Sequence, residues 1–377
     1  MMKDFPTPVA LTQHLVTFDT TNPPGREHAC TEYLGRLLES AGFTTEFYEF
    51  APGRTTLIAR LEGTARTVPL CFSGHVDTVP PGAAPWQIDP FKGKIAGNKI
   101  YGRGTADMKG GIAAMVIACL RIARLAKEKA NIMMILSAGE ETGCQGAYHL
   151  AANITSLGKA GALVIGEPTS NYPFIGHKGA LFAEAQISGT AAHGSMPDTG
   201  VNAVYRAAEV VTKLQHFDFH VPPHAIYGTP TLNVGTIQGG TTINMVPDRA
   251  LIGIDIRTIP GQRTGNIIEQ LQQFLGEDVT LTCLTAADGV STDPDHEWMR
   301  EVFGITKSYL REQPIPRIAP YFTDASALKP ALGNPPTVIL GPGEPDMAHK
   351  TDEYCTISNI ETATEIYTEI ALKWYHL

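Results

Sequence analysis

The sequence predicts an α/β protein with a mostly parallel central sheet and a smaller α+β unit inserted into the chain. Apolar runs such as 132–136 and 162–165 are short and uninterrupted, as in strands buried on both faces, and helical patterns alternate with them. Between residues 179 and 287 the pattern changes to the order β-α-β-β-α-β. The first kind of alternation resumes afterwards, so this segment is expected to be an insertion.

Composition narrows the class of protein. A chain of 377 residues favours more than one domain, and a formal net charge of −9 without a basic cluster argues against nucleic acid as a partner. Six cysteines without a C-x-x-C pair indicate reduced thiols and a reducing compartment. Residues 1–16 lack a secretory signal, and no apolar run reaches the ~18 residues of a membrane span. We therefore expect a cytoplasmic protein without a membrane partner.

The elements of the first part follow from apolar spacing and from the residues that end helices. Apolar residues three and four positions apart predict a helix over 30–41, and Gly42 is a typical C-terminal stop. The prolines and glycine of 20–25 end an earlier helix. In chain order we expect helices at 9–18, 30–41 and 111–125, and strands at 43–50, 56–61, 68–73, 132–136 and 162–165.

The inserted unit, residues 179–287, is expected to be a ferredoxin-like two-layer domain with an antiparallel sheet. Its strands are expected at 181–188, 231–237, 250–257 and 279–284, and its helices at 201–214 and 267–275. The main domain then comprises residues 1–178 and 288–377. Its last elements are expected to be helices at 295–310 and 325–332, a strand at 337–340 and an amphipathic helix at 357–374.

Acidic residues and histidines follow several of these strands. His75 and Asp77 come after strand 68–73 and share one side of an extended backbone, so the carboxylate can hold the imidazole. Each candidate alone also has a simpler explanation, such as a surface histidine, a helix N-cap at Asp107 or a solvated Glu-Glu turn. The candidates are His75, Asp77, Asp107, Glu140, Glu141, Glu167 and His349.

The glycine-rich segment 101–111 resembles a phosphate-binding loop only in part. Asp107 stands where the third glycine of G-x-G-x-x-G would be, and no strong strand pattern precedes it. Nucleotide binding is therefore disfavoured, and Asp107 is better explained as an acid placed before the buried helix 111–125.

The predicted strands bring these candidates to one place. The carboxyl ends of parallel strands share one edge of a sheet, where open α/β folds bind ligands. Two histidines and several carboxylates without a cysteine suit zinc, manganese or cobalt in a catalytic site, and they are numerous enough for two ions. Of two adjacent carboxylates, one can bind a cation while the other acts as a base.

Five motifs resemble those of the M20 family of dinuclear zinc amidohydrolases. In chain order they are SGHVDTVP, YGRGTADMKGG, SAGEETG, GEPT and MAHKTDE. Within that family the chain is most similar to the acetylornithine deacetylase and succinyl-diaminopimelate desuccinylase branch. The resemblance implies a zinc-exopeptidase-like catalytic domain and an inserted lid or dimerisation domain.

The resemblance also implies a role for each candidate in the catalytic domain. It assigns His75 and Glu167 to one zinc ion and Glu141 and His349 to the other, with Asp107 bridging and with cobalt or manganese as substitutes. Further implications are that Asp77 orients His75, that Glu140 is the general base, and that the Asp107–Met108 peptide is cis.

In the inserted domain the resemblance points to His193, Asn244 and Arg257. His193 would stabilise the oxyanion, from its own chain or from the partner in a homodimer that forms through this domain. Asn244 and Arg257 would contact the substrate, with Arg257 clamping a carboxylate, although a strand-end arginine can also be a plain surface residue. Gly341, in the main domain, would add a backbone contact.

The activity implied is metal-dependent hydrolysis of the amide bond of a small N-acyl amino acid. The first expectation is a succinyl-diaminopimelate desuccinylase of lysine biosynthesis; the alternatives are an acetylornithine deacetylase of arginine biosynthesis and a di- or carboxypeptidase of the same family. A metal-free binding protein is disfavoured because every ligand position is filled. Segments 175–181 and 321–326 depart from the stretches of well-known desuccinylases, so the acyl group and the amine stay open.

Overall fold

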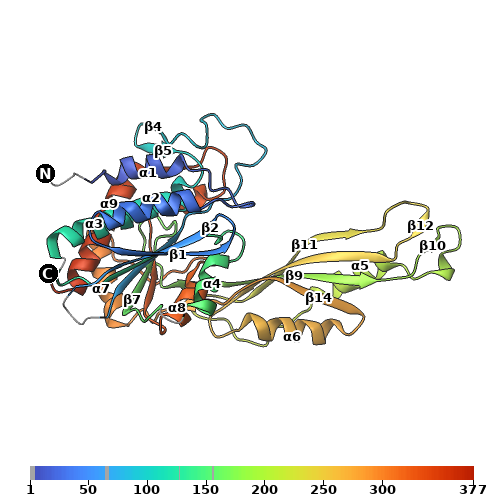
Figure 1. Ribbon diagram of the computed structural model, residues 1–377. Coiled ribbons are helices and arrows are strands. Elements are labelled where there is room, and N and C mark those ends of the chain that lie inside the picture. The colour runs from blue at the N-terminus through green and yellow to red at the C-terminus, as the bar shows by residue number, and fades with distance from the viewer. Residues whose placement is uncertain (1–4, 64–67, 127, 155–156) are drawn as a thin grey trace. The chain divides into compact units, whose positions relative to one another are not determined.

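The computed structural model describes residues 5–63, 68–126, 128–154 and 157–377. The chain divides into two compact units (Figure 1). We call residues 1–176, 291–319 and 323–377 the main unit, and residues 177–290 and 320–322 the inserted unit. Among the described helices, none has both the length and the apolar character needed to cross a membrane.

The main unit is built on a sheet with the strand order β1-β2-β6-β3-β7-β16. The strands are β1 (Thr44–Ala51), β2 (Arg54–Leu61), β3 (Leu70–His75), β6 (Ile132–Ser137), β7 (Ala162–Ile165) and β16 (Thr337–Ile339). Strands β6, β3, β7 and β16 run parallel to one another, whereas β2 is antiparallel to both β1 and β6. The predicted α/β fold with a largely parallel sheet is confirmed, but β6 has a parallel neighbour on one side only.

Strands β3, β6 and β7 are buried along their whole length, which explains their unbroken apolar runs. His75 is the last residue of β3, not a loop residue beyond it as expected. The helices of this unit are α1 (Pro8–Val16), α2 (His28–Glu39), α3 (Gly110–Ala126), α4 (Gln145–Asn153), α7 (Glu297–Leu310), α8 (Ala325–Ala331) and α9 (Ile357–Trp374). Helix α4 was not predicted, because its burial is confined to Gly146, Ala147 and Leu150.

Helix α3 is buried and packs against α1 and α9 (Figure 1). Its first turn approaches the end of β7 so closely that a Cβ on Gly111 would lie 2.2 Å from the Gly166 carbonyl oxygen. Before the helix, η1 (Thr105–Lys109) is an irregular turn, in which Asp107 has φ −123° and ψ 94°. The Asp107–Met108 peptide is cis, as the family resemblance implied.

A small sheet beside the main one was not predicted from the sequence. It has the order β17-β5-β4, from β4 (Lys94–Ala96), β5 (Lys99–Tyr101) and β17 (Tyr354–Thr356). Three-residue strands are too short to show a periodic pattern. The pairing of Tyr354 with Tyr101 brings the loop that follows β5 to the loop that precedes β17.

The inserted unit has the element order β9 (Gly179–Ser188), α5 (Ala203–Leu214), β11 (Thr231–Gly239), β13 (Arg249–Thr258), α6 (Thr264–Leu275) and β14 (Val279–Ala287). Its sheet, in the order β11-β13-β9-β14, is antiparallel throughout. Alternate residues of β9 and β13, such as Ala185 and Ile254, form its core with Ala207 of α5 and Leu271 of α6. Helix α5 begins two residues later than expected because Asn202 caps it.

Four short strands and two short turns complete the described elements. Strand β10 (Ala192–His193) pairs with β12 (Met245–Val246), and β15 (Val290–Ser291) pairs with β8 (Gly176–His177). The turns are η2 (Pro197–Thr199) and η3 (Pro345–Met347). The cysteines are free thiols, and all except Cys283 are buried.

Candidate metal centre

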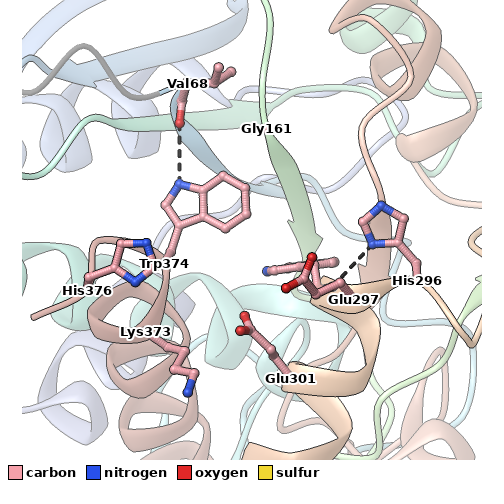
Figure 2. Close-up of a pocket in the computed structure, with 9 residues that line it drawn as sticks. Val68, Gly161, His296, Glu297, Glu301, Lys373, Trp374 and His376 are labelled. Atoms are coloured by element: carbon pink, nitrogen blue, oxygen red, sulfur yellow. Dashed lines mark hydrogen bonds between the residues drawn. The ribbon is translucent and has the colours of Figure 1, made fainter.

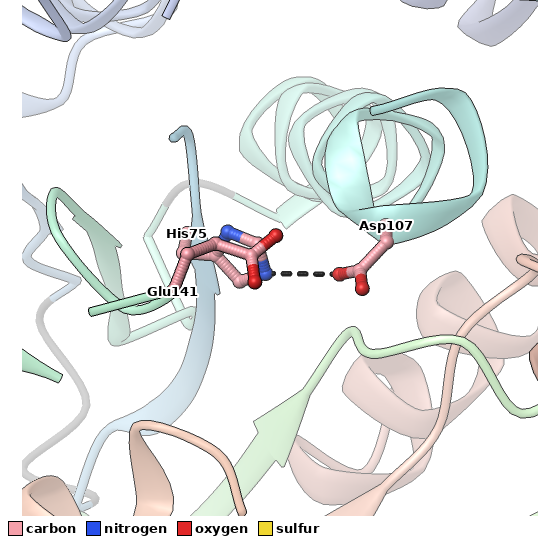
Figure 3. Close-up of side chains that lie close together, drawn as sticks. All are labelled: His75, Asp107 and Glu141. Carbon is pink, nitrogen blue, oxygen red and sulfur yellow. Dashed lines mark hydrogen bonds and ion pairs between the residues drawn. The ribbon is translucent and has the colours of Figure 1, made fainter. Parts of the chain in front are cut away.

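His75 and Asp107 face each other at the end of β3. The side chain of His75 is buried, and its Nε2 lies 3.0 Å from Asp107 Oδ1 and 3.6 Å from Glu167 Oε1. In Figure 3 the contact from His75 to Asp107 is dashed, and Glu141 overlaps His75 in the view. Burial lowers the pKa of His75. The carboxylates of Glu167 and Asp107 raise this pKa by more than burial lowers it, so that it lies well above its usual value.

Asp107 lies between two histidines. While its Oδ1 faces His75, its Oδ2 lies 3.4 Å from His349 Nε2, and that nitrogen is also 3.0 Å from Glu141 Oε2. Hydrogen bonds to Asp107 and Glu141 raise the pKa of His349 to about 10. One carboxylate is thus shared by two imidazoles, each of which has a second carboxylate beside it.

The centre contains more carboxylate groups than histidine side chains that could balance their negative charge. Burial, followed by the neighbouring Asp107 charge, raises the pKa of Glu141, and burial raises that of Glu167 to about 8. Within the described part of the chain, Glu141 Oε1 is buried without a hydrogen-bond partner. His75, Asp107 and Glu141 each place one ligand atom within 4.8 Å of the others. This group therefore has the charge and the donor atoms of a cation site.

Asp77 anchors the loop that carries Glu140 and Glu141. Its Oδ1 accepts the amide N–H of Glu140 at 3.1 Å, and its Oδ2 accepts that of Glu141 at 3.2 Å. His75 Nδ1 lies 3.0 Å from the Asp77 carbonyl oxygen and 3.6 Å from its carboxylate. Asp77 therefore fixes the histidine mainly through its backbone, and its carboxylate fixes the glutamate loop.

His193 and Asn244 meet in the inserted unit. Strands β10 and β12 pair His193 with Met245, and Gly194 donates its N–H to the Asn244 carbonyl. His193 Nδ1 lies 2.7 Å from Ser195 Oγ, and the histidine is exposed. His193 and Asn244 line one pocket of about 400 Å³, so two of the three candidates from this unit share a surface.

Arg257 and Gly341 already have partners inside the protein. Arg257 makes a two-point contact with Asp255, from Nε at 2.8 Å and Nη2 at 3.2 Å. Gly341 donates its N–H to Thr169 Oγ1, and its carbonyl accepts the N–H of Asn171. A substrate would have to compete with these contacts.

A separate pocket of about 580 Å³ opens on the main unit between α7 and α9 (Figure 2). It is lined by Glu297 and Glu301, by Lys373, and by Trp374, whose indole N–H donates to the Val68 carbonyl. None of the residues singled out in the sequence lines it. It is therefore not part of the candidate centre.

Comparison with known proteins identifies the family. Residues 71–373 match the model of peptidase family M20/M25/M40. The chain belongs to the M20 family. An acetylornithine deacetylase of Vibrio campbellii is 31% identical to this M20 chain, and the match covers 91% of this chain and 90% of the relative. A probable succinyl-diaminopimelate desuccinylase of Staphylococcus epidermidis is 30% identical over 96% of each.

Solved structures of M20 proteins share the fold. An M20 family metallo-carboxypeptidase of Sulfolobus solfataricus matches with a TM-score of 0.82 and 19% identity, over 99% of this chain and 100% of that one. A tripeptidase of Staphylococcus aureus matches with a TM-score of 0.78 and 21% identity, over 98% of each chain. The resemblance inferred from the motifs is confirmed, and this M20 chain is a hydrolase of the amidohydrolase and peptidase class.

Sequence reasoning missed two buried residues beside the centre of this M20 chain. Asn22 Nδ2 donates to Asp77 Oδ2 at 2.8 Å and to Thr142 Oγ1 at 2.9 Å. Asp324 accepts a hydrogen bond from Ser137, the last residue of β6, and burial raises the pKa of Asp324 to about 6. In the sequence, Asn22 indicates only the end of a helix, and Asp324 lies in a segment that departs from a known loop. Their contacts could not be predicted, because Asp77 is distant in sequence from Asn22 and Ser137 is distant from Asp324.

Proposed function

We propose that this M20 protein hydrolyses the amide bond of an N-acyl amino acid with the help of two bound metal ions. The observation that carries the proposal is the position of Asp107, whose two oxygens face His75 and His349 at 3.0 and 3.4 Å. A carboxylate shared in this way is suited to hold two cations a few ångströms apart.

The residues present fit such ions. The donors are imidazole nitrogens and carboxylate oxygens, which suit zinc in a catalytic site and also manganese or cobalt. We assign His75 and Glu167 to one ion, His349 and Glu141 to the other, and Asp107 to both. Two observations support this assignment: Glu141 Oε1 has no hydrogen-bond partner among the described residues, and the pKa values of Glu141 and Glu167 are raised. A bound cation would give that oxygen a partner and would stabilise both carboxylates in their charged form.

Glu140 is the proposed general base. The ions, when bound, supply Lewis-acid chemistry that makes water more acidic and the amide carbonyl more electrophilic. Glu140 takes a proton from the attacking water and passes it to the leaving amine. Its amide N–H is held by Asp77, and burial, despite the nearby His75 charge, raises the pKa of its carboxyl well above the usual value.

The substrate class follows from the relatives of about 30% identity. Their names, acetylornithine deacetylase and probable succinyl-diaminopimelate desuccinylase, both describe enzymes that free an amine from an N-acyl amino acid. We propose desuccinylation of N-succinyl-diaminopimelate as the first activity and deacetylation of N-acetylornithine as the second candidate. A di- or carboxypeptidase activity is the third, since solved structures with this fold carry peptidase names.

The inserted unit is proposed to complete the site and to form a homodimer. His193 would stabilise the oxyanion, while Asn244, Arg257 and Gly341 would hold the substrate. Support for the first two comes from their shared pocket. Support for dimerisation comes from apolar side chains that are exposed on this unit, namely Tyr205 at 71%, Ile237 at 52% and Ile243 at 103%.

A substrate panel tests the proposal. The zinc-loaded protein is assayed for amine release from N-succinyl-diaminopimelate, N-acetylornithine and a set of dipeptides, before and after removal of metal by a chelator. We expect hydrolysis of an N-acyl amino acid, loss of activity with the metal, and recovery when zinc is restored. Activity that survives complete removal of metal would refute the mechanism, and turnover of dipeptides alone would refute the substrate class.

A further inference from the structure

A buried ion pair, Arg103–Glu353, lies beside the metal centre without contributing a donor to it. Glu353 is 0% exposed and Arg103 is 1% exposed, and Arg103 Nη1 lies 2.6 Å from Glu353 Oε2. A buried pair costs much desolvation free energy, so its presence alone is weak evidence that it stabilises the fold. The informative observation is where its remaining hydrogen bonds go.

Glu353 holds the backbone of the loop that carries Asp107. Its Oε2 accepts the N–H of Gly104 at 2.9 Å, and its Oε1 accepts those of Ala106 at 2.8 Å and Asp107 at 3.1 Å. The carboxylate thus binds the amide of the proposed bridging ligand itself. Hydrogen bonds to an ionised acceptor are among the strong ones, so they fix the loop well.

Arg103 holds the backbone of the loop that carries His349. Its Nη2 donates to the His349 carbonyl at 3.4 Å, and its Nη1 donates to that of Lys350 at 3.3 Å. Nη2 also donates to the Pro80 carbonyl at 3.2 Å, on the segment that follows His75 and Asp77. The planar guanidinium can serve these carbonyls at once, whereas a lysine ammonium is a single point donor.

The two loops need such a connection because of their conformation. His349 and Asp352 have positive φ values of 63° and 57°, which non-glycine residues adopt only when their surroundings hold them there. The Asp107 loop is irregular as well. Beyond the β5–β17 pairing at Tyr101 and Tyr354, one backbone hydrogen bond, from the Gly102 N–H to the Glu353 carbonyl at 2.9 Å, still joins the two loops. The side-chain hydrogen bonds of Arg103 and Glu353 extend this connection to Asp107 and His349.

We propose that Arg103 and Glu353 are positioning residues that tie the backbone of Asp107 to that of His349 and thereby form the metal position shared by His349, Glu141 and Asp107. The inference rests on the metal centre proposed above and deepens it. Partners that orient metal ligands in this way typically change metal affinity about 10- to 100-fold when they are lost. The position held by His75 and Glu167 depends less on the pair, because His75 is fixed by β3 and by Asp77.

The test replaces Glu353 with glutamine and counts metal ions. A glutamine presents an amide NH₂ to the N–H donors, so at least one of the two oxygens loses its hydrogen bonds. For Glu353→Gln we expect zinc binding by the metal-free protein to fall from two ions per chain to one tight ion, with the second bound about 10- to 100-fold more weakly. A second variant, Arg103→Lys, keeps the positive charge but loses the planar guanidinium, and it is expected to weaken binding of the same zinc ion. This variant keeps the inference testable if Glu353→Gln misfolds.

A readout without metal separates positioning from a general loss of structure. In the metal-free protein, hydrogen exchange at the amides of Gly104, Ala106 and Asp107 is expected to be faster in Glu353→Gln than in the wild type. The matched control is Glu27→Gln, which breaks another buried pair, with Arg54 Nε 3.0 and 2.9 Å from the two Glu27 oxygens. That pair binds no backbone of a proposed ligand, so the control is expected to keep both ions and the exchange rates of all three amides.

The outcomes are distinct. A wild type that binds two ions beside a Glu353→Gln variant that binds both with unchanged affinity overturns the positioning role. A wild type that binds fewer than two ions overturns the dinuclear centre on which the inference rests. Loss of the second ion from Glu27→Gln to the same degree would show that any buried pair has this effect, and would likewise overturn the inference.

Discussion

At the scale of single residues, the proposed centre contains two adjacent glutamates with different surroundings. Glu140 and Glu141 are neighbours in sequence, yet Glu141 faces His349, while Glu140 lies near His75 and Cys144. Both amides are held by the one carboxylate of Asp77. Their different surroundings support the proposal that Glu141 binds a metal ion and Glu140 moves a proton.

Replacement of Glu140 by alanine separates these two roles. We expect Glu140→Ala to keep the metal content of the wild type, while kcat falls by about 10²- to 10⁴-fold, since that is what a positioned acid–base group contributes. The measurements are metal analysis and steady-state kinetics, with the exposed Glu361→Ala on α9 as control. A variant with full turnover would exclude Glu140 as the base.

At the scale of elements, the close approach of α3 to β7 sets the distance between Asp107 and Glu167. Asp107 lies just before α3, and Glu167 lies just after β7. The two elements approach at glycines, since a Cβ on Gly111 would meet the Gly166 carbonyl oxygen and a Cβ on Gly166 would meet Met115. A larger residue at position 111 must push the helix away from the strand.

The helix glycines therefore give opposite expectations. Gly111→Ala is expected to lower the free energy of unfolding by about 1–3 kcal/mol, because the added methyl group overpacks the site. Gly304→Ala on α7, where an added Cβ has nothing within 4 Å, is expected to raise it by about 0.5–1 kcal/mol through the loss of glycine's freedom in the unfolded chain. Denaturant unfolding measures both, and equal signs would contradict this packing argument.

The elements also show what the sequence could and could not predict. Runs such as that of β6 were readable because strands buried on both faces are apolar throughout. The acids after these strands could be placed together because the carboxyl ends of parallel strands share one edge of a sheet. The short strands β5 and β17 carry no periodicity, and the pair of Arg103 with Glu353 spans 250 positions, so neither could be predicted from local pattern.

At the scale of the whole molecule, the division into two units separates the proposed metal ligands from His193. The ligands belong to the main unit, and His193 belongs to the inserted unit with Asn244. In the sequence, His193 was a loop residue without an evident role, and only the family resemblance singled it out. The structure adds the pocket that it shares with Asn244.

Two variants together test the role of His193. His193→Ala is expected to keep both metal ions and to lose most of its turnover, because the oxyanion loses its donor. A mixture of His193→Ala with Glu140→Ala is expected to regain activity if the subunits exchange, since a partner chain with an intact His193 then completes a site with an intact Glu140. Full activity of His193→Ala alone would refute the oxyanion role, and a mixture that forms mixed dimers yet stays inactive would refute action from the partner chain.

The pairing of Tyr354 with Tyr101 has a consequence for how the protein is made. During synthesis, Asp107, Glu141 and Glu167 leave the ribosome long before His349 and Glu353, and the entire inserted unit is translated in between. Until then the acids of the nascent chain lack the imidazole of His349, and the Asp107 loop lacks its hydrogen bonds to Glu353. The proposed cation position of His75 and Glu167 can thus begin to form early, whereas the other proposed position must wait until residues 349–353 have been translated.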